Sequence, residues 1–467
     1  MYQQKILDYF TLHREDLIED VKTLVRIRSD KGDAAPGAPF GPGPNAALEA
    51  CLAMAQEKGF ITKNYDGYVG TIDINNAPAQ LDMLAHLDVV PVADNWTVCD
   101  PFDPVVKDGK IYGRGSSDDK GPVVAALWAM QCVRDLGVPL SRRARLIVGT
   151  DEECGSGDIA HYYALEPEAP MTFSPDADFP VINIEKGGFH GHMTASFVPS
   201  TLLPRVTAFQ SGFKVNVVPD TAQAEIAGLT AAEARSICDA FSAESGLTFE
   251  LTESDTGLQI NCIGVGSHAA YPESGNNALT GLLALLARLP LADCDSTRKL
   301  QGLSRLYPHG DWSGTAVGVE MSDEISGPLT LSFNMLQVDE AGLDGWFDSR
   351  APLCADDDNM KNVVIRNCAA AGIQVEDLPM RPPHHVPADS PLVQSLLAIY
   401  EQYTGLKGKP LAIGGGTYVH ELKNGVAFGC VMPGTNTNMH GADEFAVIDE
   451  LIISAEMFAQ AIINLCS

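Results

Sequence analysis

The pattern of apolar and polar positions alternates between helix-like and strand-like stretches over the first 150 residues of the chain. Apolar residues recur at helical spacing in three stretches, and two shorter runs are continuously apolar, as buried strands are. The elements predicted from this pattern are helices at 6–29, 46–58 and 123–136 and strands at 81–87 and 145–150. Strand, helix and strand in this order predict an α/β domain with a mixed, mainly parallel sheet flanked by helices.

The pattern changes after Gly187 and Gly188. Alternating stretches predict strands, interspersed with helices, which is typical of a separate α+β domain. The elements predicted there are strands at 212–218, 247–252 and 329–338 and helices at 231–244, 277–289 and 358–371. Helical patterns return at 392–403 and 449–465. We therefore expect an α/β domain made of residues 1–187 and 385–467, interrupted by an inserted α+β domain at 188–384.

Composition narrows the partners and the location that we expect. The 467 residues include 61 acidic and 31 basic side chains, for a net charge of −30. Nucleic acids and anionic membranes bind clustered Lys and Arg, so we expect neither as a partner. The 11 cysteines are scattered singly, as in a reduced cytoplasmic protein. The charged N-terminus is unlike a signal peptide, and no apolar run reaches membrane-spanning length, which also favours the cytoplasm.

Five short motifs combine histidine with carboxylates. They are His86-Leu87-Asp88, Gly113–Gly121, Thr150–Glu153, Ser174–Asp178 and Asn438–Glu444. Three of them follow predicted strands, and open α/β sheets bind ligands at the carboxyl ends of their strands. Nitrogen and carboxylate ligands without cysteine suit catalytic zinc, and also cobalt or manganese. Each motif alone also has an ordinary explanation, such as a surface pair, a solvated acidic face or a helix cap.

Together and in this order, the motifs resemble the M20 family of metallopeptidases. The resemblance runs over nearly the whole chain, from about Asp8 to Leu465. Within the family, the chain is most similar to the PepV-type bacterial dipeptidases. The segments that carry this closer similarity are Pro101–Pro104, Asp108–Lys110, Asp118–Pro122, Phe173–Pro180 and Gly414–Tyr418.

The resemblance implies a site for two zinc ions, for which cobalt or manganese could substitute. His86, Asp118 and Asp176 would hold one ion. Asp118, Glu153 and His440 would hold the other, so that Asp118 bridges the two. Two metal ions about 3.5–4 Å apart can share a carboxylate and hold one water between them.

Two further residues of these motifs are expected to act beside the ions. The resemblance makes Glu152 the general base, and a carboxylate outside the metal cage can take a proton from the bridging water and pass it to the leaving amine. It makes Asp88 the acceptor for the second ring N–H of His86, which would fix the tautomer of the imidazole. Many family members also have a cis peptide at the position of Asp118 and Asp119.

The resemblance makes residues 1–187 and 385–467 a zinc-binding catalytic domain and residues 188–384 an inserted lid domain. It also assigns roles to residues of the lid domain and of a glycine-rich loop. His268 would polarise the scissile carbonyl, because a developing oxyanion needs a donor. Asn216 and Arg350 match binders of the substrate carboxylate, for which a planar guanidinium is well suited. Gly415 and Gly416 would let backbone N–H groups approach the substrate. Taken alone, these residues could also be a loop histidine, a surface charge and an ordinary turn.

The resemblance implies a zinc dipeptidase that hydrolyses short peptides with a free C-terminal carboxylate. The same metal cage would serve an amidohydrolase of N-acyl amino acids, so that alternative stays open. A non-catalytic peptide-binding protein would be expected to lack a ligand or the base, and each expected residue type is in place. The enlarged inserted domain implies a monomer. His420 occupies a place where relatives often carry Arg, which bears on substrate preference.

Overall fold

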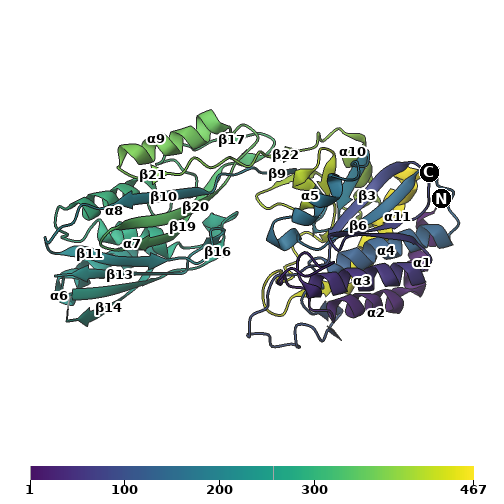
Figure 1. The fold of residues 1–467 in the computed structure, drawn as a ribbon, viewed down its shortest axis with the longest axis horizontal. Coiled ribbons are helices and arrows are strands. Elements are labelled where there is room, and N and C mark those ends of the chain that lie inside the picture. Colours follow the sequence, from purple (N-terminus) through teal and green to yellow (C-terminus); the bar gives the residue numbers. More distant parts are fainter. Residues whose placement is uncertain (1, 256) are drawn as a thin grey trace. The chain divides into compact units, whose positions relative to one another are not determined.

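A computed structural model of the chain describes residues 2–255 and 257–467. The chain forms two compact units (Figure 1). The first unit comprises Met1–Glu185, His384–Leu411 and Gly416–Ser467, and the second comprises Lys186–Pro383 and Ala412–Gly415. The segment Ala412–Gly415, which the sequence pattern assigned to the first domain, therefore belongs with the second unit. No helix in the described part of the chain is both long and apolar enough to cross a membrane.

The main sheet of the first unit has the strand order β1-β2-β6-β3-β7-β24-β9-β22. The central strands β6, β3, β7 and β24 run parallel, and the strands towards both edges are antiparallel. This arrangement confirms the predicted mixed sheet, with its parallel pairings at the centre. The strands in this order are β1 (Ile61–Tyr65), β2 (Val69–Asp73), β3 (Ala79–His86), β6 (Arg143–Gly149), β7 (Met171–Ser174), β9 (Val181–Glu185), β22 (His384–His385) and β24 (Gly425–Ala427). A further strand, β23 (Pro410–Ile413), also pairs with β9.

Helices cover both faces of this sheet. Leu81 and Met83 of β3 pack into a core with the long helices, whereas Leu84 points to the opposite face and packs beside Ile159 of α5. Both α4 and α11 contact β3 (Figure 1). The helices are α1 (Gln3–Leu12), α2 (Arg14–Val25), α3 (Pro42–Glu57), α4 (Lys120–Asp135), α5 (Gly157–Tyr163), α10 (Pro391–Thr404) and α11 (Ile448–Cys466).

The single helix predicted at 6–29 is wrong, because the structure has two helices there. His13 ends α1 and precedes α2, and its backbone angles of φ −102° and ψ 15° lie outside the helical region. Apolar residues continue at helical spacing across the break, since Ile6 and Phe10 of α1 and Leu17 of α2 enter the same core. The apolar pattern therefore does not reveal the change of direction.

Two small sheets in the first unit join segments that are distant in sequence. In one, β26 (Phe445–Val447) pairs with β5 (Lys110–Tyr112), which pairs with β4 (Val105–Lys107). In the other, β25 (Cys430–Val431) pairs with β8 (Ala177–Asp178). The first of these sheets brings the chain before Asp118 next to the chain after His440.

The second unit is built on an antiparallel sheet with the order β14-β15-β13-β11-β19-β20-β10-β21. Its strands are β10 (Gly191–Ser196), β11 (Arg205–Ser211), β13 (Thr221–Ala227), β14 (Thr248–Ser254), β15 (Gly257–Ile263), β19 (Thr330–Val338), β20 (Gly342–Arg350) and β21 (Gln374–Val375). Its helices are α6 (Ala231–Ser245), α7 (Ala278–Leu286), α8 (Asp295–Leu306) and α9 (Asn362–Ala370). A separate two-stranded pair joins β12 (Val217–Val218) to β16 (Ser267–His268).

The strand predicted at 212–218 is wrong over most of its length. The main strand, β11, ends at Ser211, and only Val217 and Val218 are extended in β12. Gly212 between them has φ +77°, a left-handed conformation that glycine adopts readily and that ends the strand.

Candidate metal centre and substrate-binding residues

The parallel strands of the first unit place their motifs at one edge of the sheet. His86 is the last residue of β3, and its neighbours β6 and β7 end shortly before Glu153 and Asp176. Parallel strands share the edge at which their carboxyl ends lie, so segments distant in sequence converge there. Asp118 lies two residues before the first residue of α4, and His440 lies in the loop before β26.

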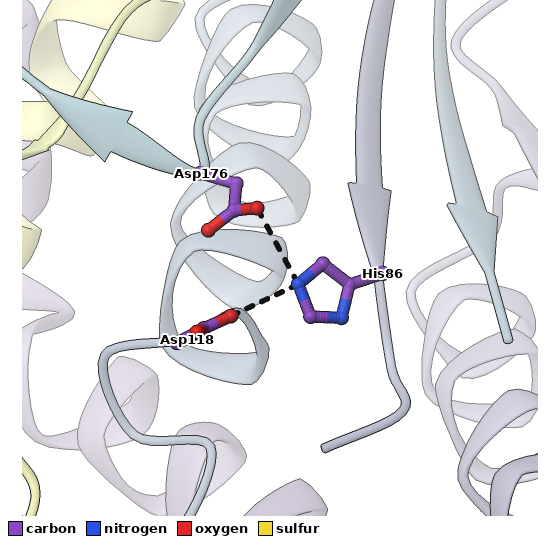
Figure 2. A group of neighbouring side chains, drawn as sticks. All are labelled: His86, Asp118 and Asp176. Carbon is purple, nitrogen blue, oxygen red and sulfur yellow. Dashed lines mark ion pairs between the residues drawn. The ribbon is translucent and has the colours of Figure 1, made fainter. Parts of the chain in front are cut away.

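These side chains form two triads that share Asp118. The Nε2 atom of His86 lies 3.0 Å from Oδ1 of Asp118 and 3.4 Å from Oδ2 of Asp176 (Figure 2). The Nε2 atom of His440 lies 2.9 Å from Oδ2 of Asp118 and 3.2 Å from Oε1 of Glu153. Within each triad, the potential ligand atoms lie within 4.8 Å of one another. Each oxygen of Asp118 thus faces a different histidine, as expected of a bridging carboxylate.

The residues present fit a pair of divalent cations. The Nε2 atom of His86 is buried and, although it lies near Asp118 and Asp176, it makes no hydrogen bond of acceptable geometry within the described residues. A buried polar atom without a partner is rare and calls for an explanation, such as a missing ion. The donor set of imidazole nitrogens and carboxylates, without thiolate, is the set that catalytic zinc, cobalt or manganese uses.

The electrostatics of the site favour added positive charge. Burial opposes ionisation of His440, but its hydrogen bonds to Asp118 and Glu153 prevail and raise its pKa to about 11. Burial, followed by the charge of Asp118, raises the pKa of Glu153 to about 7. Burial raises the pKa of Glu152 well above 4.5, and the charge of Asp176 adds to the effect. Such shifts mark crowded, desolvated carboxylates, which a divalent cation would neutralise.

Asp88 connects His86 to Glu152 and Glu153, although its contact with His86 differs from the one that the sequence suggested. The Nδ1 atom of His86 lies 3.0 Å from the backbone carbonyl oxygen of Asp88 and 3.4 Å from its Oδ1. The two carboxylate oxygens of Asp88 instead accept hydrogen bonds from the backbone N–H groups of Glu152 and Glu153, at 3.1 Å each. The carbonyl is therefore the closer acceptor for the imidazole, and the carboxylate positions the two glutamates.

Asp119 is a residue that the sequence analysis left without a role. Its Oδ2 atom accepts the backbone N–H of His86 at 3.0 Å, and its side chain is fully buried. The peptide bond between Asp118 and Asp119 is cis. Asp119 thus links the end of β3 to the segment that carries the shared ligand. In the sequence, Asp119 was marked only by its position next to the expected ligand Asp118.

In the second unit, the β12–β16 pair brings Asn216 and His268 together. Val217 is the register partner of His268, and the N–H of Ala269 donates to the carbonyl oxygen of Asn216 at 2.9 Å. The Nδ1 atom of His268 accepts the N–H of Ala270 at 3.1 Å, so the neutral ring carries its proton on Nε2. The Oδ1 atom of Asn216 is buried and has no hydrogen-bond partner among the described residues.

Arg350 lies at the end of β20 in the same unit. Its Nη2 donates to Oδ2 of Asp348 at 2.7 Å and its Nη1 to the carbonyl oxygen of Gly414 at 2.8 Å, while its buried Nε has no partner within the described residues. A Cβ atom on Gly414 would lie 3.1 Å from Cβ of Ala270 and 3.4 Å from Cγ of Arg350. A Cβ on Gly415 would meet only Ile413, at 3.6 Å. The close approach that requires glycine is therefore at Gly414.

His420 is buried in the first unit. Its Nδ1 lies 3.2 Å from Oε2 of Glu185, which is itself fully buried. Glu185 also accepts hydrogen bonds from the backbone N–H and the hydroxyl of Thr417. His420 therefore takes part in holding the segment that follows the glycine-rich loop. The sequence analysis did not consider Glu185, because it lies at the end of the short strand β9 and matches no motif.

Comparisons with known proteins match the same family over nearly the whole chain. The family described as Peptidase family M20/M25/M40 matches residues 83–464. A protein of Bacillus subtilis (strain 168) named "Putative dipeptidase YtjP" is 38% identical over 459 residues, which cover 97% of each chain. The Beta-Ala-Xaa dipeptidase of Lactobacillus delbrueckii subsp. lactis is 32% identical over 456 residues, covering 97% of this chain and 96% of its own.

Solved structures share the fold at much lower identity. Human carnosine dipeptidase 1 has a TM-score of 0.61 at 15% identity, covering 99% of this chain and 98% of its own. Aminoacylhistidine dipeptidase from Vibrio alginolyticus has a TM-score of 0.57 at 16% identity, covering 97% and 96%. Taken with the family match and the two relatives above 30% identity, these findings show that the chain is a metallopeptidase that belongs to peptidase family M20/M25/M40.

Proposed function

We propose that this chain is a zinc-dependent dipeptidase that hydrolyses the peptide bond of short peptides with a free C-terminal carboxylate. The observation that carries the proposal is the pair of triads that share Asp118, with a further glutamate, Glu152, that belongs to neither triad. The two relatives described above are both named as dipeptidases, which supports the same substrate class. Cobalt or manganese could replace zinc, because the ligand set suits all three.

In this proposal His86, Asp118 and Asp176 hold one ion, and Asp118, Glu153 and His440 hold the other. When bound, such ions polarise a peptide carbonyl and lower the pKa of water. Glu152 then acts as the general base that takes a proton from the attacking water and returns it to the leaving amine. Asp88 supports this role, because its carboxylate fixes the backbone of Glu152 and Glu153.

The proposed substrate contacts of the second unit follow from its polar atoms. His268, with its proton on Nε2, can donate a hydrogen bond to the developing oxyanion. Arg350 and Asn216 each carry a buried polar side-chain atom without a partner in the described part of the chain. Buried polar groups are normally satisfied, so such atoms favour a polar ligand. We propose that Arg350 and Asn216 bind the substrate carboxylate. The backbone N–H groups of Gly415 and Gly416 would contact the same end of the substrate.

The first experiment tests the metal and the reaction together. The purified protein is stripped with a chelator, shown by elemental analysis to be metal-free, and reloaded with zinc, cobalt or manganese. We expect hydrolysis of unmodified dipeptides to disappear on stripping and to return on reloading. Hydrolysis that persists in the metal-free protein would refute metal dependence, and a reloaded protein that hydrolyses neither substrate class would refute the enzymatic proposal.

The second experiment separates the dipeptidase from the alternative. Each dipeptide is compared with its C-terminal amide and with the N-acetyl and N-succinyl derivatives of its second amino acid. We expect turnover of the free dipeptide and a large loss with the amide, which lacks the carboxylate. Turnover of the acylated amino acids alone would overturn the dipeptidase assignment and favour an N-acyl amino acid amidohydrolase.

The oligomeric state is part of the same proposal. The second unit spans Lys186–Pro383, which is large for an inserted domain, and we infer from its size that the protein is a monomer. Sedimentation velocity at several concentrations should give the mass of one chain, and a stable dimer would contradict this inference.

A further inference from the structure

Arg114 and Glu444 form a buried ion pair beside the candidate metal centre, and neither belongs to a ligand triad. Nη1 of Arg114 lies 2.5 Å from Oε2 of Glu444. Arg114 is 2% exposed and Glu444 is fully buried. Both residues lie in motifs with histidine or carboxylate ligands, but the proposed reaction uses neither of them. Burying two charges is costly unless further hydrogen bonds satisfy their remaining polar atoms, so the other contacts of this pair are informative.

Glu444 holds the loop that ends at the shared ligand Asp118. Its Oε1 atom accepts the backbone N–H groups of Gly115 and Ser117 at 3.0 Å each and that of Asp118 at 3.2 Å. Its own carbonyl oxygen accepts the N–H of Gly113 at 3.0 Å. A carboxylate that gathers several backbone N–H groups fixes the path of that backbone, since each charge-assisted bond is directional.

Arg114 holds the loop that carries His440, the histidine of the Asp118–Glu153–His440 triad. Its Nη2 donates to the carbonyl oxygens of His440 and Gly441, at 3.1 and 3.0 Å. His440 itself has φ +62°, and Asn438 in the same loop has φ +55°. Left-handed conformations are unfavourable for residues other than glycine, so this loop depends on contacts from outside it. The forked guanidinium supplies them while Nη1 remains bound to Glu444.

We propose that Arg114 and Glu444 are positioning residues that set the geometry of the Asp118–Glu153–His440 triad. The pair is a direct link between the backbone of Asp118 and the backbone of His440. Within the described residues, none of the contacts of its charged groups reaches His86 or Asp176. Disturbing the pair should therefore weaken the metal position at His440 more than the one at His86, because the pair contacts the loop of His440 and otherwise only the backbone leading to the shared ligand Asp118. This inference rests on the proposed metal centre.

The main variant is Arg114→Lys. It keeps the positive charge opposite Glu444, but an ammonium lacks the planar fork that donates to the carboxylate and to two carbonyls at once. The second variant is the double change Arg114→Met with Glu444→Gln. It removes both charges together, so no buried charge is left without a partner, and glutamine keeps an acceptor for the N–H groups near Asp118.

The experiment places these changes in two backgrounds that each keep one triad intact. His440→Ala leaves His86, Asp118 and Asp176, whereas Asp176→Ala leaves Asp118, Glu153 and His440. Metal-free proteins are titrated with zinc in competition with a chromophoric chelator, and the visible spectrum of bound cobalt reports the geometry of the occupied position. Thermal unfolding of each metal-free protein controls for folding.

We expect Arg114→Lys to weaken zinc binding by roughly 10–100-fold in the Asp176→Ala background, the range found for groups that orient metal ligands. In the His440→Ala background, the loss of affinity and the change in the cobalt spectrum should be smaller, because Asp118 is then the one remaining ligand whose backbone the pair contacts in the described part of the chain. The double variant should weaken binding in both backgrounds but again more in Asp176→Ala, so a folding defect of either variant leaves the other as a test. Equal weakening in both backgrounds, or none in either, would overturn the inference. Failure of the unaltered chain to bind zinc would instead refute the metal centre itself.

Discussion

Asp82 is a buried acid in β3, the strand that ends at His86, and its replacement by asparagine should change how the stability of the first unit depends on pH. The side chain is 3% exposed and its Oδ1 has no hydrogen-bond partner in the described residues. Its register partner Arg145 is committed elsewhere, because its guanidinium binds Asp73 and the hydroxyl of Tyr162. Burial therefore raises the pKa of Asp82 from 3.8 to about 7.

The size of the effect follows from that pKa. A raised carboxyl pKa means that the folded state retains a proton which the unfolded state has lost, so stability falls as the pH rises from about 4 to about 7. At about 1.4 kcal/mol for each pH unit between the two pKa values, the full loss is about 4 kcal/mol. About 3 kcal/mol of it should accrue between about pH 5 and pH 8.

Asp82→Asn removes this ionisation. The amide brings a fixed penalty of its own, so the test is the change in stability between the two pH values and not the stability at either one. Urea unfolding read by pulsed hydrogen exchange of peptides from β3 and β6 reports the first unit alone. The variant should lose about 3 kcal/mol less than the parent on going from about pH 5 to pH 8.

A matched control is Asp103→Asn, which removes an exposed acid of the same unit. Water screens an exposed charge, so this change should leave the pH dependence of the parent in place. If Asp82→Asn also left it in place, burial of Asp82 would not be the source of the pH dependence, and the reasoning would be refuted.

Three further predictions concern the proposed reaction. Glu152→Gln should lower kcat by about 10²–10⁴-fold with zinc content unchanged, whereas Glu153→Gln should reduce bound zinc; loss of zinc in the first variant would contradict the assigned base. His268→Ala should lower kcat by roughly 10²–10³-fold without altering zinc binding, and an unaltered kcat would exclude it as the oxyanion donor. Arg350→Ala should raise KM and lower kcat for free dipeptides. Equal effects on dipeptides and on their C-terminal amides would refute the assignment of Arg350 to the substrate carboxylate.

The motifs were readable from the sequence because they join local pattern to residue type. β3 and α4 follow from apolar runs that begin and end close to the predicted positions. His86 and Asp118 stand at their ends, where a parallel sheet gathers ligands. Recognising that five such motifs occur in one order required only the linear chain. The alternation of apolar and polar residues within β20 and β10 was too weak to predict either strand. Both strands are held in the second sheet by pairing, β20 with β10 and with β19, and the pairing of β10 with β20 joins segments far apart in sequence.

What the sequence by itself determined is the α/β layer, together with the candidate ligand set and the proposed general base that it carries, because these depend on residue types and on spacing within single elements. Only the tertiary structure decided the partners of those residues. It turned His86 towards the carbonyl of Asp88, placed His420 against Glu185 and linked the loops of Asp118 and His440 through Arg114 and Glu444. The physical reason is that a buried polar group pairs with whichever groups are desolvated beside it, and the long-range packing of the chain selects them.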